Sequence, residues 1–381
     1  MKLLNSLILF LLTVNYALAV PTKTNPDISL NILLLGQKSF QDKPSEKESH
    51  KGSAHSHEGH QHQSTDGVSV QEVELYFKSN IDPYWTGNIS LGLAQHGSHF
   101  DLDLETAYID SLFIPNFTLR AGKFYTFFGR HNDLHSHYYP FIDPPLINQK
   151  LFGFHGLNGV GASIAYLSPL PWYSEAVIQT IKEEHYRGIL FLKNLWDLTD
   201  QSTLELDLTY ARTIKELSKP NSFSLVSINN ITNYINQIDL WKDLYNLSLT
   251  WKWQDGNNIN SAVWTTELVY SNGKLSKQST KPPRGLALKN LKPTKNAASL
   301  NSYIQFQLLK NWWLQGRAEV ILDSKWKQIE LQKYSTLLAW TATEYSAVRL
   351  QYDMIKINAD WSYAIALQTN MSLGAHPAHL Y

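Results

Sequence analysis

The chain lacks cysteine, has no surplus of either charge sign, and carries no long apolar run after its first 19 residues. The missing cysteines exclude disulfides, thiolate metal sites, iron–sulfur clusters and cysteine nucleophiles. Lys plus Arg and Asp plus Glu each total 33 of 381 residues. A net charge of zero argues against nucleic acid as a partner, because phosphate binding requires a basic surplus. Charged residues make up only 17%, against roughly 25% in soluble domains.

The N-terminus has the pattern of a secretory signal. Lys2 supplies the positive charge, residues 7–14 form a short apolar run, and residues 17–19 (ALA) form a small-x-small cleavage site. The run is too short for a transmembrane helix, which needs about 20 apolar residues. We therefore predict a signal peptide over residues 1–19. A secreted chain without cysteine fits a bacterial envelope.

From residue 68 onward, apolar and polar residues alternate with a period of two. This is the pattern of strands with one apolar face. It is clearest at residues 73–77, 89–93, 102–105, 204–210, 247–253, 304–308, 348–353 and 363–373. At about 20 residues per strand and connection, the segment provides roughly 16 strands. The sequence therefore predicts an all-β fold, a transmembrane antiparallel β-barrel over residues 68–381. Residues 20–67 would precede it as a short strand and a His-rich flexible segment.

Aromatic residues favour the barrel over a soluble alternative. The chain has 12 Trp and 20 Tyr, and several stand in pairs at strand ends, where membrane barrels meet the headgroup layer. Short connections alternate with long ones, as in outer-membrane barrels. A soluble β-sandwich also alternates apolar and polar faces, but it does not explain so little charge with so many aromatics at strand ends.

Acidic residues dominate the first third of the predicted inner face. We assign Glu72, Glu74, Asp101, Asp103, Glu105, Glu205 and Asp207 to the lumen, with Lys252, Arg317 and Arg349 later in the chain. Rings of carboxylates favour cations. An equally open alternative is that these charges only hydrate and stiffen the lumen.

Two His-rich segments are candidate metal sites. The first comprises His55, His57, His60 and His62, in a polar tract that could capture Zn²⁺ or Cu²⁺ loosely or could simply be a solvated linker. The second lies in a long loop after a predicted strand and offers mixed nitrogen and oxygen ligands: His131, Asp133, His135, His137 and Asp143. The alternative for this second segment is a packing loop whose imidazoles bind backbone groups. No cofactor is required by either interpretation.

The stretch 119–149 (LRAGKFYTFFGRHNDLHSHYYPFIDPPLINQ) resembles zinc-regulated TonB-dependent outer-membrane receptors of bacteria. Weaker matches are residues 25–30, 50–62, 156–161 and 374–379. The resemblance implies an outer-membrane barrel linked to zinc or another divalent metal. Energised receptors of that class carry a plug domain and about 22 strands, for which this chain is too short. The same stretch is also similar to phosphate-selective porins, although no lysine ladder is present.

These observations lead to two functional hypotheses. The first is a porin-like outer-membrane channel or receptor for small hydrophilic solutes, with divalent metal ions such as zinc preferred. The second is a barrel that scavenges metal or mediates adhesion without a conducting pore. We do not expect an enzyme, because nucleophile elbows, phosphate loops and zinc-protease motifs are missing from the sequence. Expected partners are outer-membrane lipid and, by analogy with porins, further copies in a homotrimer. An energy-transducing partner is not favoured.

Overall fold

The structure, a computed structural model, describes most of the chain beyond the predicted signal peptide. The described residues are 26–41, 61–64, 66–96, 99–153, 156–183, 185–216, 225–228, 241–256, 260–273, 296–322, 329–357 and 360–374. The predicted signal peptide and His55, His57 and His60 lie outside them.

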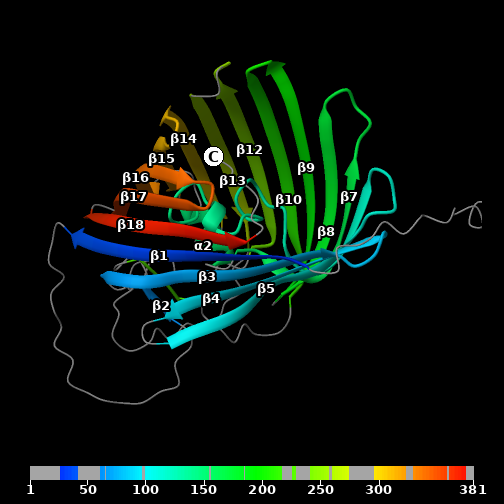
Figure 1. Ribbon diagram of the computed structural model, residues 1–381, viewed down its shortest axis with the longest axis horizontal. Coiled ribbons are helices and arrows are strands. Elements are labelled where there is room, and N and C mark those ends of the chain that lie inside the picture. Colours follow the sequence, from blue (N-terminus) through cyan, green and yellow to red (C-terminus); the bar gives the residue numbers. More distant parts are fainter. Residues whose placement is uncertain are drawn as a thin grey trace, which may run out of the picture.

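Within these residues, sixteen strands close into one antiparallel barrel, as the alternating pattern predicts (Figure 1). Each strand pairs with its neighbour in the chain, apart from the pair that closes the ring. The strands are β1 (Asp27–Gln41), β3 (Gly67–Asn80), β4 (Trp85–His96), β5 (His99–Ser111), β6 (Phe117–Tyr125), β7 (Asn158–Leu167), β8 (Tyr173–Lys182), β9 (His185–Thr199), β10 (Ser202–Glu216), β12 (Asp243–Gln254), β13 (Ser261–Asn272), β14 (Asn296–Leu309), β15 (Trp312–Leu322), β16 (Ile329–Thr343), β17 (Ser346–Ile357) and β18 (Asp360–Gly374).

The first strand lies in the barrel wall, between the last strand and β3. Ser29 pairs with Gly374, and Gln41 pairs with Ser362. The barrel therefore begins at Asp27, and the predicted boundary at residue 68 is wrong for this strand. Its pairing partner lies more than 300 residues later, so the local pattern could not reveal that it closes the ring.

The two faces of the strands separate apolar from polar side chains, as predicted. In β10, Glu205, Asp207 and Thr209 are buried inside, whereas Leu208 is exposed on the outer face. Exposed Leu, Ile, Val and aromatic side chains cover the outside of nearly every strand. An outer face of this kind suits lipid, and the buried polar groups stay inside.

Aromatic side chains gather at both ends of the barrel. At the short-turn end, Trp312 and Trp340 lie with ring centroids 6.3 Å apart. At the opposite end, Tyr210, Tyr245 and Tyr270 form a row across three neighbouring strands. Two such bands mark the levels at which a membrane barrel meets the headgroups.

The strands that flank the four longest connections meet at one end of the barrel, which we call the long-loop end: β1, β6, β10 and β13 finish there, and β3, β7, β12 and β14 begin there. At the other end, which we call the short-turn end, successive strands are joined by short connections throughout. A separate pair of short parallel strands, β2 (Gln61–Ser64) and β11 (Leu225–Ile228), joins two of the long connections. In the described part of the chain the helices are short, α2 (Leu146–Phe152) and the 3₁₀ turn η1 (Ser136–Tyr138). None is long and apolar enough to cross a membrane.

Candidate functional site

The connection between β6 and β7 folds into the barrel. We call its described residues, 126–153 and 156–157, the lumen loop. Figure 1 shows α2, which belongs to this loop, inside the ring of strands. The loop forms hydrogen bonds or ion pairs with the inner face of β3, β5, β8, β10, β13 and β15 to β18. The wall groups that take part in hydrogen bonds include Gln71, Gln179, Thr209, Glu267, Glu319, Arg349, Gln351 and Asn370.

The helical part of the loop packs into an apolar ring at the long-loop end. Leu146, Ile147 and Leu151 of α2 are buried against inward side chains from the ends of the strands. The helix begins after Pro145, and its first amide, Leu146 N–H, donates to Glu319 Oε2 at 2.6 Å. It ends at Gly153, whose φ of +74° is a glycine conformation. The wall strands that contribute apolar residues are β6, β8, β9, β10, β12, β13, β15, β16 and β17.

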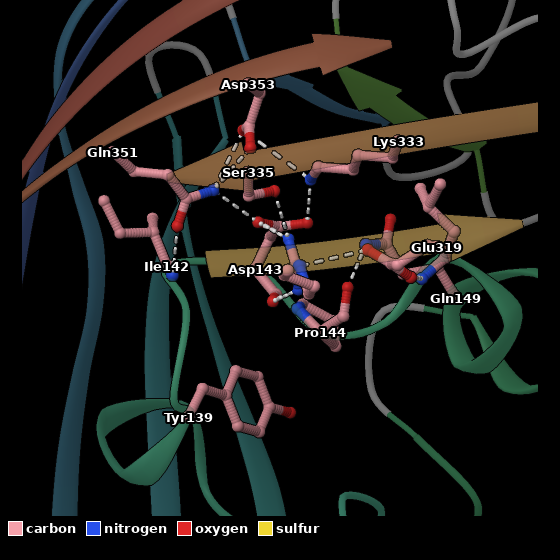
Figure 2. Close-up of polar contacts among 12 residues, drawn as sticks. Tyr139, Ile142, Asp143, Pro144, Gln149, Glu319, Lys333, Ser335, Gln351 and Asp353 are labelled. Atoms are coloured by element: carbon pink, nitrogen blue, oxygen red, sulfur yellow. Dashed lines mark hydrogen bonds and ion pairs between the residues drawn. The ribbon is translucent and has the colours of Figure 1, made fainter. Parts of the chain in front are cut away.

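Asp143 anchors the loop to the wall formed by β15, β16 and β17. Its Oδ1 accepts from Arg317 Nη2 and from Gln351 Nε2, both at 2.8 Å, and its Oδ2 lies 2.5 Å from Lys333 Nζ. Figure 2 shows these contacts converging on one carboxylate. Burial opposes the charge of Asp143, but Arg317 and Lys333 hold its pKa well below the usual range. The anchor is therefore ionised at neutral pH.

His131 lies near the Asp143 anchor, and its imidazole is neutral. It is 6% exposed, and its ring centroid lies 4.2 Å from that of Tyr139. Burial, together with the charge of Arg317, lowers the pKa of His131 to about 3. Its Nε2 is buried without a hydrogen bond among the described residues. The position is that of a packed core imidazole.

A second polar centre joins the loop to another part of the wall, beyond β18 and β1 in the ring, and we call it the acid–imidazole cluster: Glu72 and Glu74 of β3, Glu105 of β5, and His135 and His137 of the loop. His135 Nδ1 lies 2.8 Å from Glu74 Oε1 and 3.3 Å from Glu105 Oε2. His137 Nδ1 lies 2.7 Å from Glu74 Oε2. One ligand atom each from Glu74, Glu105 and His135 lie within 4.8 Å of one another, a spacing that could hold a metal ion.

Irregular strand pairing places these carboxylates together. The register of β4 and β5 shifts so that Leu91 faces Leu104 while Ser90 faces Thr106, which leaves Glu105 as the extra residue of a bulge. Bulges re-aim side chains next to functional sites, and Glu105 and Thr106 are both buried. A similar shift between β1 and β3 precedes Glu72.

Small polar groups complete the cluster. The Ser90 hydroxyl lies 2.9 Å from Glu74 Oε1 and 2.7 Å from Glu105 Oε2. Glu72 accepts a hydrogen bond from the Ser136 hydroxyl. A side chain at Gly92 would begin 3.1 Å from the Glu105 carboxyl group and 3.2 Å from that of Glu72. The glycine therefore leaves the space in which these two carboxylates meet.

The electrostatics of His135 differ from those of His131. Burial disfavours its charge, but the carboxylates of Glu74 and Glu105 raise the pKa of His135 well above the usual value. Its ring lies edge-on to Tyr125 and Tyr76. Of these two imidazoles in one loop, His131 is therefore neutral and His135 is protonated, because each ring faces different charged groups of the wall.

The structure brings only part of the predicted metal set together. His135 and His137 share the acid–imidazole cluster, as the spacing suggested. Asp143 lies at the wall formed by β15, β16 and β17 with His131 near it, while the charged groups around Asp133 include Lys193 and Arg130. Burial raises the pKa of Asp133. The five residues do not form one site, because the extended loop turns successive side chains toward different strands. In the His-rich tract with His55, His57 and His60, the remaining candidate His62 falls in β2.

Sequence reasoning assigned Glu72, Glu74 and Glu105 to the lumen, and burial of Glu74 and Glu105 agrees with this. It did not assign them as partners of the loop histidines. The sequence signal for these partners was the high density of acidic residues between positions 72 and 105. The β-bulges that bring the carboxylates together cannot be recognised from the alternation of apolar and polar residues. Lys333 and Asp353, which complete the Asp143 anchor, were also missed.

Comparisons with known proteins agree with this fold. The trimer form of OmpT, an outer membrane protein of Vibrio cholerae, superposes with a TM-score of 0.52 and 6% sequence identity. The match covers 91% of this chain and 99% of the OmpT chain. An anion-selective porin from Comamonas acidovorans gives a TM-score of 0.55 and 7% identity, over 92% of this chain and all of that one. At these identities the likeness is one of fold. A protein of Aquifex aeolicus (strain VF5), described as uncharacterized, is 25% identical over 375 residues, covering 85% of this chain and 73% of that protein. No family model matches.

The fold is that of the outer-membrane porins. The structure confirms the barrel that the resemblance implies, and the solved structures that share it include porins. The zinc-regulated and TonB-dependent parts of the resemblance remain predictions, as does the expectation that the chain is not an enzyme.

Proposed function

We propose that this protein passes small hydrophilic solutes across the outer membrane, with a preference for cations, divalent metal ions such as Zn²⁺ among them. The observation that carries the proposal is the position of the lumen loop. The loop crosses the barrel interior beside a wall that presents Glu72, Glu74 and Glu105. Solutes would pass a narrowed section with carboxylates on one side, and carboxylate rings favour cations.

The size of the barrel supports this proposal. Sixteen strands enclose a lumen wider than side chains alone can fill. The loop reduces that lumen without replacing its polar lining, since most buried wall residues are polar or charged.

Planar bilayers test the proposal directly. The purified protein should give lasting open currents, and a salt gradient should give a reversal potential of the sign that indicates cation preference. Glu72→Gln with Glu74→Gln should reduce the cation-to-anion permeability ratio several-fold. Glu344→Gln, at an exposed turn on the short-turn end, removes the same charge outside the lumen and should change the ratio little. Equal ratios in both variants would contradict the assignment.

One observation favours the second hypothesis, a barrel without a conducting pore. The apolar packing of α2 involves strands along much of the long-loop end. A protein that stays silent in bilayers yet binds Zn²⁺ would support a scavenging role, and an open current without added ligand would exclude it.

We further propose that the barrel forms a homotrimer. One structure with this fold is described as a trimer form. Light scattering of the detergent-solubilised protein, corrected for bound detergent, would distinguish three copies from one.

A further inference from the structure

The two halves of the lumen loop are attached to the barrel by different chemistry. On the side of β15 to β17, Asp143 meets permanent cations, Arg317 and Lys333. Lys333 also lies 3.6 Å from Asp353, and Arg317 Nε lies 3.1 Å from Glu319. In this anchor the carboxylates are therefore paired with Arg and Lys side chains of the wall.

On the side of β3 and β5, the Arg and Lys side chains of β6 pair with other acids of β5: Arg120 with Asp110 and Lys123 with Asp103. No Lys or Arg of the described chain forms an ion pair with Glu72, Glu74 or Glu105. Their ion-pair partners there are the imidazoles of His135 and His137. Three carboxylates thus face two imidazoles in a largely buried space, where unbalanced charge is costly.

Glu74 Oε2 and His135 Nδ1 are among the buried atoms of this cluster that make no aligned hydrogen bond within the described residues. Glu74 Oε2 lies 2.7 Å from His137 Nδ1, and His135 Nδ1 lies 2.8 Å from Glu74 Oε1. Glu74 is 3% exposed. Nitrogen and oxygen atoms that can ligate a metal therefore point into one common space, and one atom each from Glu74, Glu105 and His135 lie within 4.8 Å of one another.

We propose that Glu74, Glu105, His135 and His137 bind one divalent transition-metal ion, which fastens the lumen loop to β3 and β5. This inference rests on the proposed function in taking divalent metal ions as the ligand class. It adds that the ion holds the loop in place, rather than only passing along it. Ligation would join two wall strands to two loop residues, His135 and His137, which are separated by one residue.

The donor set selects the class of ion. Two imidazole nitrogens and two carboxylate oxygens suit Zn²⁺, Co²⁺ or Ni²⁺, whereas Cu⁺ prefers sulfur and Ca²⁺ or Mg²⁺ prefers oxygen alone. In a tetrahedral site with bonds of about 2.1 Å, ligand atoms lie roughly 3.4 Å apart. The closest contacts of 2.7 and 2.8 Å would have to widen by about 0.6 Å, which small side-chain rotations supply.

Binding is measured first, with the full chain in detergent. The background variant replaces His50, His55, His57, His60 and His62 by Asn, so that the polar tract cannot contribute. Titration calorimetry with Zn²⁺, and the visible spectrum of Co²⁺, should then report one site with mixed nitrogen and oxygen ligands. His135→Gln with His137→Gln, and separately Glu105→Gln, should weaken binding by at least about 100-fold, since even outer-shell partners are worth 10- to 100-fold. Asp133→Asn removes a carboxylate of the same loop and should leave the affinity unchanged.

Hydrogen exchange then tests the fastening. With Zn²⁺ at 100 times its dissociation constant, amides of residues 131–139 should exchange about 100-fold more slowly, while those of α2 should change little. Heat-modifiable gel migration identifies variants that have not formed the barrel, and Glu105→Gln keeps the volume of the wall. Undiminished binding in the His135→Gln/His137→Gln variant, or binding that leaves loop exchange unchanged, would overturn the proposal. Bilayer currents measured in EDTA, which removes the metal ion, test the channel separately. The absence of current would refute transport but would not contradict the metal site.

Discussion

The Asp143 anchor gives a quantitative test of what holds the loop inside the barrel. Asp143→Asn keeps the shape of the side chain and removes its charge, so Arg317 and Lys333 lose their shared partner. Breaking a buried ion pair by removing one member costs roughly 3–5 kcal/mol. Both cations keep another carboxylate, Glu319 for Arg317 and Asp353 for Lys333. We therefore expect the lower end, about 3 kcal/mol, in the free energy of docking the loop.

That loss raises the population of the undocked loop by about 100-fold, because each 1.4 kcal/mol is a factor of ten. Hydrogen exchange at residues 141–152 should accelerate by this factor, and bilayer currents should show larger, noisier openings. Asp353→Asn is the matched control, since it removes the same charge from the same network, and the contacts of Asp353 among the described residues are with Lys333 and Gln351 of the wall. If exchange and currents in Asp143→Asn matched those of the unmodified protein, the loop would have to be held elsewhere.

Three further changes have expected outcomes. The pKa of His131 is lowered in the docked loop, so the docked loop binds fewer protons than the undocked one. Docking should therefore weaken as the pH falls below about 6.5, by up to about 1.4 kcal/mol per pH unit. His131→Gln should abolish this pH dependence of loop hydrogen exchange between pH 6.5 and 5, and an unchanged dependence would assign it to another group. Gly92→Ala should displace the Glu105 carboxylate and lower Zn²⁺ affinity in calorimetry without preventing folding; unchanged affinity would remove Gly92 from the site. Leu350 lies on the outer face in the middle of β17 and is 47% exposed. Leu350→Arg should lower the free energy of unfolding in vesicles by about 2–4 kcal/mol, while Tyr345→Arg at the rim should lower it by about 0–1 kcal/mol. Equal losses would contradict the assigned membrane depth.

Alternation along the chain was sufficient to predict the barrel, because side chains facing lipid and water must take turns on every strand. Residues 204–210 and 247–253 were predicted as strands and lie in adjacent β10 and β12. At β1 a short strand was predicted correctly, but it was placed before the barrel and not in its wall. What distinguishes a wall strand from an isolated one is its pairing partner, and that partner is at the far end of the chain.

The site was only partly predictable for a related reason. His135 and His137 were found because they are close in sequence, and so were Asp143 and His131, which face another wall. Proximity in sequence identifies which groups a loop carries, but the strand that each one meets depends on how the loop crosses the lumen. Glu105 illustrates the limit, since its orientation depends on one extra residue in β5.

The pairing of β1 with β18 has a consequence for how the molecule is made. The seam of the cylinder joins the first and last strands of the described barrel, so a chain synthesised only as far as β17 has no complete circumference. Until β18 is made, two rows of backbone amides and carbonyls lack partners, and such rows are not tolerated in hydrocarbon. Closure in the membrane must therefore await β18, and loss of either β1 or β18 would leave the cylinder open.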